Sequence, residues 1–113
     1  NAALEYAAQN LVKRSAEILL ANELDIENAN ISGLKGSIVD RLLLSQSRIE
    51  NIAEALRDLI SLDDPVGEVI SMKQRPDGLK IGQKRVPIGV IGMIYESRPN
   101  VTADVFGLCI KTS

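Results

Sequence analysis

The chain of 113 residues contains no histidine, no tryptophan and a single cysteine. Without histidine, neither a Ser-His or Cys-His catalytic pair nor a His-ligated metal site can form within these residues, and we predict no metal site. One cysteine excludes an internal disulfide, which is typical of a protein from a reducing compartment. No apolar run is long enough to span a bilayer. We therefore predict a cytoplasmic protein that binds no membrane.

Aromatic residues make up only 3% of the chain, so a core must be built from Leu, Ile, Val and Ala. Charge is unevenly divided along the sequence. Residues 1–66 carry 6 basic and 11 acidic side chains, a balance of −5, whereas residues 67–113 carry 7 basic and 4 acidic, a balance of +3. The basic part lacks the interleaved aromatic residues that stack on bases, so nucleic acid is not a predicted partner.

The first 66 residues predict a helical segment. Apolar residues recur at spacings of three and four over residues 2–20, which predicts one amphipathic helix. A short helix is expected over residues 21–30. Two glycines and two serines in residues 30–37 then predict a linker.

Two further helices are predicted before residue 66. Ser37 is expected to cap a short helix over residues 38–44. Ser47 and Glu50 have the spacing of a capping box and predict the start of the next helix. The apolar stripe of that helix is Ile49, Ile52, Ala53, Leu56 and Ile60. Its end is predicted at residues 63–65, because the residue before a proline avoids helical geometry.

After Pro65 the pattern changes to strands. Residues 68–74 and 79–86 predict two strands joined by a turn, in which Pro76 presets the bend and Gly78 supplies a positive φ. This basic hairpin occupies residues 67–87, and its lysines and arginines are expected to protect an exposed sheet edge.

The last part, residues 88–113, predicts one strand and one helix. Residues 88–95 are nearly all apolar, as expected of a strand covered on both faces. Residues 100–111 return to helical spacing through Val101, Val105 and Leu108. The chain has no initiator Met and no helix stop signal at its end, so we expect it to be part of a longer protein.

A polar knot, residues 96–100, lies between that strand and that helix. In open α/β sheets this is where ligands bind, because the following helix presents free N–H groups and a positive dipole end. Asn100 could donate to an oxyanion, and Arg98 could hold a carboxylate or phosphate. The competing interpretation is structural: Asn100 caps the helix and Pro99 directs the chain into it.

Three other residues are candidates for a functional role. Gly89 and Gly92 lie inside the predicted strand and lack the G-x-G-x-x-G spacing, so close backbone packing is favoured over phosphate binding. Cys109 lies on the predicted apolar side of the last helix without a histidine to activate it. We interpret it as a packing residue and not as a nucleophile.

Three stretches resemble the gamma-glutamyl phosphate reductases, members of the aldehyde dehydrogenase superfamily. They are "RVPIGVIGMIYESRPNVTADVFGLCIKTS", "DRLLLSQSRIENIAEALRDLISLDDPVGEV" and "LLANELDIENA". The resemblance covers essentially the whole chain, as the N-terminal quarter of such an enzyme. It implies an α/β fold with a helical segment, a β-hairpin and the first strand-helix unit of an incomplete Rossmann-type cofactor domain.

The resemblance also implies a reaction: NADPH reduces L-glutamate 5-phosphate to L-glutamate 5-semialdehyde and phosphate, the second step of proline biosynthesis. A catalytic cysteine absent from this chain would form a thioester with the substrate. Asn100 matches an oxyanion-donating Asn of related dehydrogenases. Tyr95, Glu96 and Ser97 precede it along the nicotinamide side and are candidate cofactor contacts. Arg98 as a ligand of the substrate anion is a hypothesis from its charge.

The family also implies a homo-oligomer, associated through the hairpin, and glutamate 5-kinase as a candidate partner. Two alternatives remain open from the sequence. One is another acylating aldehyde dehydrogenase-like enzyme, such as one that uses coenzyme A thioesters. The other is a helical interaction module without catalytic activity.

Overall fold

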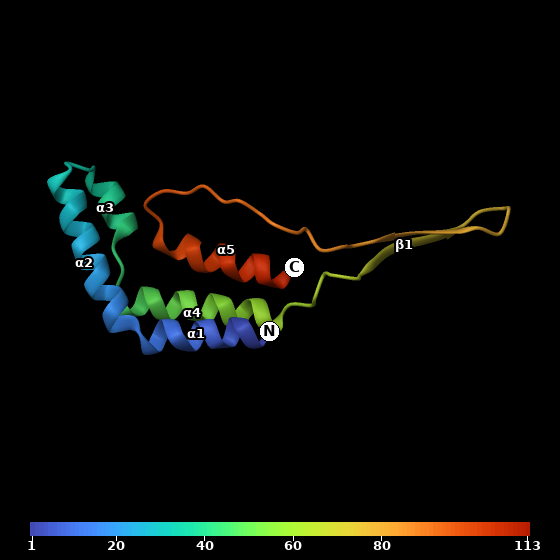
Figure 1. The fold of residues 1–113 in the computed structure, drawn as a ribbon, viewed down its shortest axis with the longest axis horizontal. Helices are drawn as coiled ribbons and strands as arrows, with labels where there is room; N and C mark the ends of the chain where they lie inside the picture. The colour runs from blue at the N-terminus through green and yellow to red at the C-terminus, as the bar shows by residue number, and fades with distance from the viewer.

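The computed structural model describes all 113 residues and contains five helices and one two-stranded sheet (Figure 1). The elements in chain order are α1 (Ala2–Lys13), α2 (Ser15–Ile31), α3 (Gly36–Leu42), α4 (Gln46–Ser61), β1 (Val69–Gln74), β2 (Lys80–Lys84) and α5 (Pro99–Lys111). Helices α1, α4 and α5 lie side by side, α2 and α3 pair at one end, and the hairpin projects from the other. No helix combines the length and the apolar character needed to cross a bilayer.

The projecting hairpin makes the molecule elongated. Its extents are 70 × 29 × 19 Å and its radius of gyration is 19.9 Å. A compact domain of about 100 residues has a radius of about 13 Å. The core is therefore confined to the helices, and every residue of β1 and β2 is exposed.

The core lies where α1 and α5 pack on α4. Leu4 and Ala8 of α1 meet Ala53 and Leu56 of α4, and all four are almost fully buried. Ala103 of α5 packs against the same cluster. The apolar stripe predicted for α4 is thereby confirmed, since Ile49, Ala53 and Leu56 of that stripe are buried.

Helix α5 approaches α4 most closely at Gly107, which is buried. A Cβ atom at this position would lie 2.6 Å from Cδ1 of Leu59 and 2.8 Å from Cδ2 of Leu56. Real Cβ atoms do not come this close to other carbon atoms. Any side chain at this position would therefore force Leu56 and Leu59 to shift, whereas glycine lets the helices meet without that change. The predicted packing face of α5 was wrong in one position, because Leu108 is 54% exposed and Ala103 and Gly107 face the core instead.

The single helix predicted for residues 2–20 is wrong. The chain bends at Arg14, whose φ of −103° and ψ of 18° end α1 and begin α2. Periodicity continues through the bend, so the local pattern did not reveal it. The bend directs α2 away from α4 and toward α3, where Asn22 contacts the connection between α3 and α4.

Two predicted helix starts were also wrong. Helix α4 is capped by Ser45, whose Oγ accepts the N–H of Arg48 at 3.2 Å, and not by Ser47. Glu50 accepts a hydrogen bond from the side chain of Gln46 and takes no part in a capping box. Helix α3 begins one residue before Ser37, after Lys35, and has no side-chain cap. Ser45 and Ser47 lie two residues apart and are both favoured N-cap residues, so the local sequence alone permits either.

The predicted hairpin is confirmed. β1 and β2 pair antiparallel around a turn in which Gly78 has a φ of 89°. Asp77 accepts the N–H of Leu79 through its carboxylate at 3.1 Å, and Arg75 and Leu79 close the turn through a backbone hydrogen bond of 2.8 Å. A bulge interrupts the pairing between Val69 and Ser71.

The strand predicted for residues 88–95 is absent. This segment runs extended above α5 without a neighbouring strand (Figure 1), and Val90 and Ile94 are fully exposed. A strand is stabilised by hydrogen bonds to a neighbouring strand, and these 113 residues supply no such strand beside this segment. The close packing expected at Gly89 and Gly92 is absent as well, since no atom lies within 4 Å of a Cβ at either; Gly89 instead has a φ of 93°. The predicted division at residues 66 and 87 stays a prediction.

The cap of α4 can be tested by a pair of serine substitutions. Ser45→Ala removes the acceptor for the N–H of Arg48 and should lower the free energy of unfolding by about 0.5–2 kcal/mol. Ser47→Ala is the matched control and should cost much less, although Ser47 touches Ser45 through a 3.0 Å hydroxyl contact. Urea unfolding of both variants decides the point. Equal losses of unfolding free energy in the two variants would contradict the assignment of the cap to Ser45.

The contact at Gly107 predicts that a larger residue is not tolerated. Gly107→Val should destabilise the protein by about 1–3 kcal/mol, because overpacking forces Leu56 and Leu59 out of place. Leu108→Val introduces the same β-branched residue on the exposed side of α5 and controls for helix propensity. Thermal unfolding that shifts equally in both variants would contradict the close approach.

Candidate functional site

The polar knot forms a tight turn between the extended segment and α5. Ser97 has a φ of 51°, a left-handed conformation in a residue other than glycine. Arg98 occupies the N-cap position without a side-chain cap, and Pro99 is the first residue of α5. Backbone strain of this kind costs about 1–3 kcal/mol and gathers at functional sites, where the surrounding structure holds it in place.

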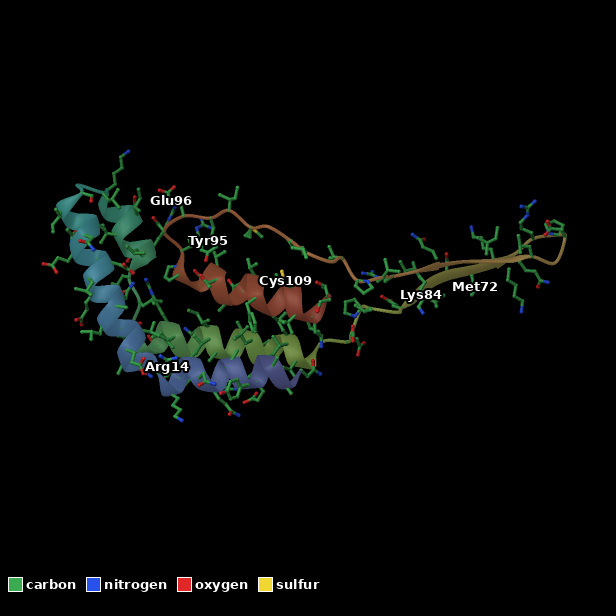
Figure 2. The ribbon with its side chains drawn as sticks, viewed as in Figure 1. Arg14, Met72, Lys84, Tyr95, Glu96 and Cys109 are labelled. Carbon is green, nitrogen blue, oxygen red and sulfur yellow. The ribbon has the colours of Figure 1, made fainter.

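Tyr95 and Glu96 stand where the extended segment turns down into the helix (Figure 2). The hydroxyl of Tyr95 is hydrogen-bonded to the hydroxyl of Thr102 in the first turn of α5, while Tyr95 as a whole stays 45% exposed. This bond ties the two sides of the turn together. Glu96 is exposed and has no hydrogen-bond or ion-pair partner in the chain.

Asn100 lies inside the first turn of α5, so the capping interpretation of this residue is wrong. Its side-chain amide donates to the carboxylate of Asp104, one turn later, at 3.1 Å. An Asn amide has two N–H groups, and this contact uses one. Asp104 thus orients the amide and leaves the second N–H available for another acceptor.

Arg98 and Asn100 both line a groove of about 650 Å³. One wall is the α3–α4 connection with the first turns of α4, and the other is the start of α5. We call this the polar groove. Its polar residues are Asp40, Arg41, Arg48, Asn51, Arg98, Asn100 and Asp104. Three guanidinium groups face two carboxylates, so the groove favours anions. Tyr95, Glu96 and Ser97 do not line it.

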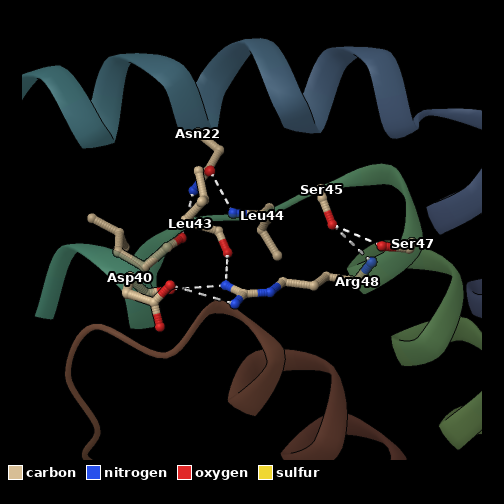
Figure 3. A network of polar contacts seen from close by, with 8 residues as sticks. Asn22, Asp40, Leu43, Leu44, Ser45, Ser47 and Arg48 are labelled. Carbon is tan, nitrogen blue, oxygen red and sulfur yellow. Dashed lines mark hydrogen bonds and ion pairs between the residues drawn. The ribbon is translucent and has the colours of Figure 1, made fainter. Parts of the chain in front are cut away.

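The wall formed by the α3–α4 connection is held by two side chains (Figure 3). Asn22, which is 6% exposed, donates to the carbonyl of Leu42 at 2.8 Å and accepts the N–H of Leu44 at 2.7 Å. Arg48 donates to the carbonyl groups of Asp40 and Leu43 and lies 3.7 Å from the carboxylate of Asp40. Both side chains satisfy backbone groups that a short connection between two helices leaves without partners.

A second groove, of about 750 Å³, lies among α1, α2, α4 and α5 and is mainly apolar. Arg14 and Glu17 form an ion pair of 2.7 Å on its edge. The hydrogen bond between them, with the attraction of their charges, lowers the pKa of Glu17 and raises that of Arg14. Because both groups are fully exposed, the pair says little about stability. This groove carries no chemically reactive group.

The chain is similar to known proteins over nearly its whole length. No family model matches it. It is 56% identical to the gamma-glutamyl phosphate reductase of Clostridium beijerinckii over 97% of the chain, and 56% identical to that of Halothermothrix orenii over 99%. The crystal structure of the gamma-glutamyl phosphate reductase of Thermotoga maritima superimposes with a TM-score of 0.89 at 50% identity over 97% of the chain. That of Saccharomyces cerevisiae superimposes with a TM-score of 0.86 at 34% identity over 96%.

Over nearly its whole length the chain is similar to one part of the gamma-glutamyl phosphate reductases. It spans about a quarter of the length of these relatives, 27% for both bacterial sequences and for the Thermotoga maritima structure. The resemblance predicted from the sequence is confirmed, and so is the coarse fold, since α/β elements in this order match that part of the reductase structures.

Sequence reasoning found two of the seven polar residues of the groove and missed the other five, together with Asn22, which supports one wall. Arg98 and Asn100 were predicted from their place after a strand. Arg41 and Arg48 come from the α3–α4 region, and Asn22 holds that region from α2. No local motif marks these three, because each is an ordinary helix residue until the fold brings α3, α4 and α5 together.

The wall of the polar groove can be tested through Asn22. Asn22→Ala leaves the carbonyl of Leu42 and the N–H of Leu44 without their partner, and each unsatisfied buried group costs about 1–3 kcal/mol. We expect a lower free energy of unfolding and faster hydrogen exchange at the N–H of Leu44. Asn28→Ala, an exposed asparagine on the same helix, is the control. Unchanged exchange at Leu44 would mean that Asn22 does not hold the wall.

Proposed function

We propose that the complete protein carrying this chain reduces L-glutamate 5-phosphate with NADPH to L-glutamate 5-semialdehyde and phosphate. This reaction is the second step of proline biosynthesis. The observation that carries the proposal is the identity of 50–56% with gamma-glutamyl phosphate reductases of known sequence and structure, over almost every residue of the chain. The names of these relatives state the substrate, and the polar groove supplies groups suited to it.

Asn100 is the proposed oxyanion donor. When a nucleophile attacks the acyl carbon of the substrate, negative charge develops on the carbonyl oxygen. A fixed N–H group at that oxygen stabilises the transition state more than the ground state. The hydrogen bond to Asp104 holds the amide of Asn100 in one orientation, and the start of α5 adds the positive end of the helix dipole.

Arg98 is the proposed ligand of the phosphate leaving group. Its guanidinium lies at the helix start, lines the same groove as Asn100 and has no ion-pair partner in the protein. A guanidinium can bind two phosphate oxygens at once, and phosphate departs as an anion that needs such a partner. The nucleophile lies outside these residues. Cys109 is half-buried and does not line the groove, so the packing interpretation is kept for it.

Tyr95, Glu96 and Ser97 are the proposed contacts for NADPH, which supplies the hydride. The turn fits the nicotinamide end of such a site, because Tyr95 exposes its ring and the strained Ser97 keeps the backbone close to α5. The chain contains no G-x-G-x-x-G loop, so the phosphates of the cofactor need groups from elsewhere.

The hairpin is the proposed contact between subunits of a homo-oligomer. It exposes several large apolar side chains, among them Val69, Ile70, Met72 and Ile81, on a two-stranded ribbon that does not touch the helical core. A ribbon of two strands is marginal by itself and gains stability from a neighbour. Glutamate 5-kinase, which makes the substrate, stays a candidate partner.

The reaction and the role of Asn100 can be tested together in the reverse direction. The complete protein is given 1-pyrroline-5-carboxylate, which is in equilibrium with the semialdehyde, together with NADP and phosphate. We expect NADPH formation that requires phosphate. Asn100→Ala should lower kcat about 100- to 1,000-fold, as the loss of an oxyanion donor does.

The control is Asn28→Ala, which should keep full activity because Asn28 is remote from the groove. Normal activity in Asn100→Ala would remove this residue from the mechanism. Activity that requires coenzyme A in place of phosphate would support the alternative acylating dehydrogenase. A folded wild-type protein with no activity in either assay would refute the enzyme assignment.

A further inference from the structure

Two arginines of the polar groove have no partner in the protein. Five of the seven arginines form ion pairs, at distances between 2.7 and 3.7 Å. The remaining two are Arg41 and Arg98. Neither makes an ion pair or a side-chain hydrogen bond, and both line the same groove. One of them, Arg41, has no role in the proposed reaction so far.

The carboxylates of the groove are already engaged. Asp40 lies 3.7 Å from Arg48, and Asp104 accepts a hydrogen bond from Asn100 at 3.1 Å. Neither therefore neutralises Arg41 or Arg98. The groove presents two uncompensated guanidinium groups on different elements, Arg41 in the last turn of α3 and Arg98 at the start of α5. An arrangement of this kind attracts a ligand with two anionic groups.

We propose that Arg41 binds the carboxylate at the end of the substrate remote from the reacting carbonyl. The inference rests on the proposed function, in which Arg98 and Asn100 face the acyl phosphate. A glutamyl chain carries its α-carboxylate at the opposite end from the phosphate. A groove of about 650 Å³ is within the range of about 300–1,000 Å³ that holds small molecules. Arg41 is then the specificity-determining residue that selects acyl phosphates with a second anionic end.

The wall that carries Arg41 is suited to this role because it is rigid. Arg41 directly precedes the connection that Asn22 and Arg48 hold by their hydrogen bonds. A cation on a held backbone loses less freedom when it binds a carboxylate than one on a loose loop. A simpler role for Arg41 is to complement the dipole at the end of α3, which any cation, including lysine, would do equally well.

The test measures how Arg41→Gln changes each Michaelis constant of the reverse reaction in the complete protein. The KM for 1-pyrroline-5-carboxylate should rise about 10- to 100-fold, because a charge-assisted contact to the carboxylate is lost. The KM for phosphate should not change, since Arg98 is intact. Arg41→Lys should give an intermediate KM, because lysine keeps the charge but not the two parallel hydrogen bonds.

Lys13→Gln, in the last turn of α1, is the matched control and should leave all constants unchanged. An unchanged KM for 1-pyrroline-5-carboxylate in Arg41→Gln would overturn the inference and leave the proposed function intact. So would an equal rise in the KM for phosphate. Arg41→Lys with wild-type constants would also overturn it, because it would reduce Arg41 to a partner of the helix dipole.

Binding of labelled glutarate and butyrate, measured by equilibrium dialysis, tests Arg41 without catalysis. Glutarate has two carboxylates and butyrate has one. The wild type should prefer glutarate. Arg41→Gln should weaken that preference about 10-fold or more, while Lys13→Gln keeps it. If the wild type forms no NADPH, the proposed function fails, and this preference still decides the role of Arg41. Equal binding of the two ligands by the wild type overturns it.

Discussion

The close contact between α4 and α5 at Gly107 is the constraint on which the rest of the site depends. Gly107 lets α5 lie against Leu56 and Leu59, and this places the first turn of α5 beside the α3–α4 connection. A larger residue would force Leu56 and Leu59 out of place and disturb the packing that holds α5 against α4. The packing of two helices thereby determines whether Arg98 can share a ligand with residues from the first half of the chain.

The polar groove combines a rigid wall with a strained one. Asn22 and Arg48 satisfy the backbone of the α3–α4 connection, so that wall is held by ordinary hydrogen bonds. The opposite wall begins at Arg98, directly after a turn in which Ser97 has a left-handed conformation and the bond from Tyr95 to Thr102 joins the two sides. Backbone strain at Ser97, beside a groove with two unpaired arginines, supports a binding site at this groove.

The chain exposes much apolar surface outside its helical core. The extended segment 88–95 and both strands of the hairpin have no cover in this structure. The relatives are about four times as long as the region matched, and in a protein of that length such segments have candidate neighbours. The small core of α1, α4 and α5 can form without them because its contacts lie entirely within these residues.

The sequence alone determined the features that depend on near neighbours. Helical periodicity marked the buried stripe of α4, and Pro76 with Gly78 marked the hairpin turn, because the physical cause of each lies within a few residues. The resemblance to the reductases was likewise carried by continuous stretches of the sequence. Only the tertiary structure showed the bend at Arg14 and the cap at Ser45. It also showed that residues 88–95 form no strand. The tertiary structure also places Arg41 and Arg98 in one groove. Helices that are far apart in the chain pack together to form this groove, so no local pattern encodes it.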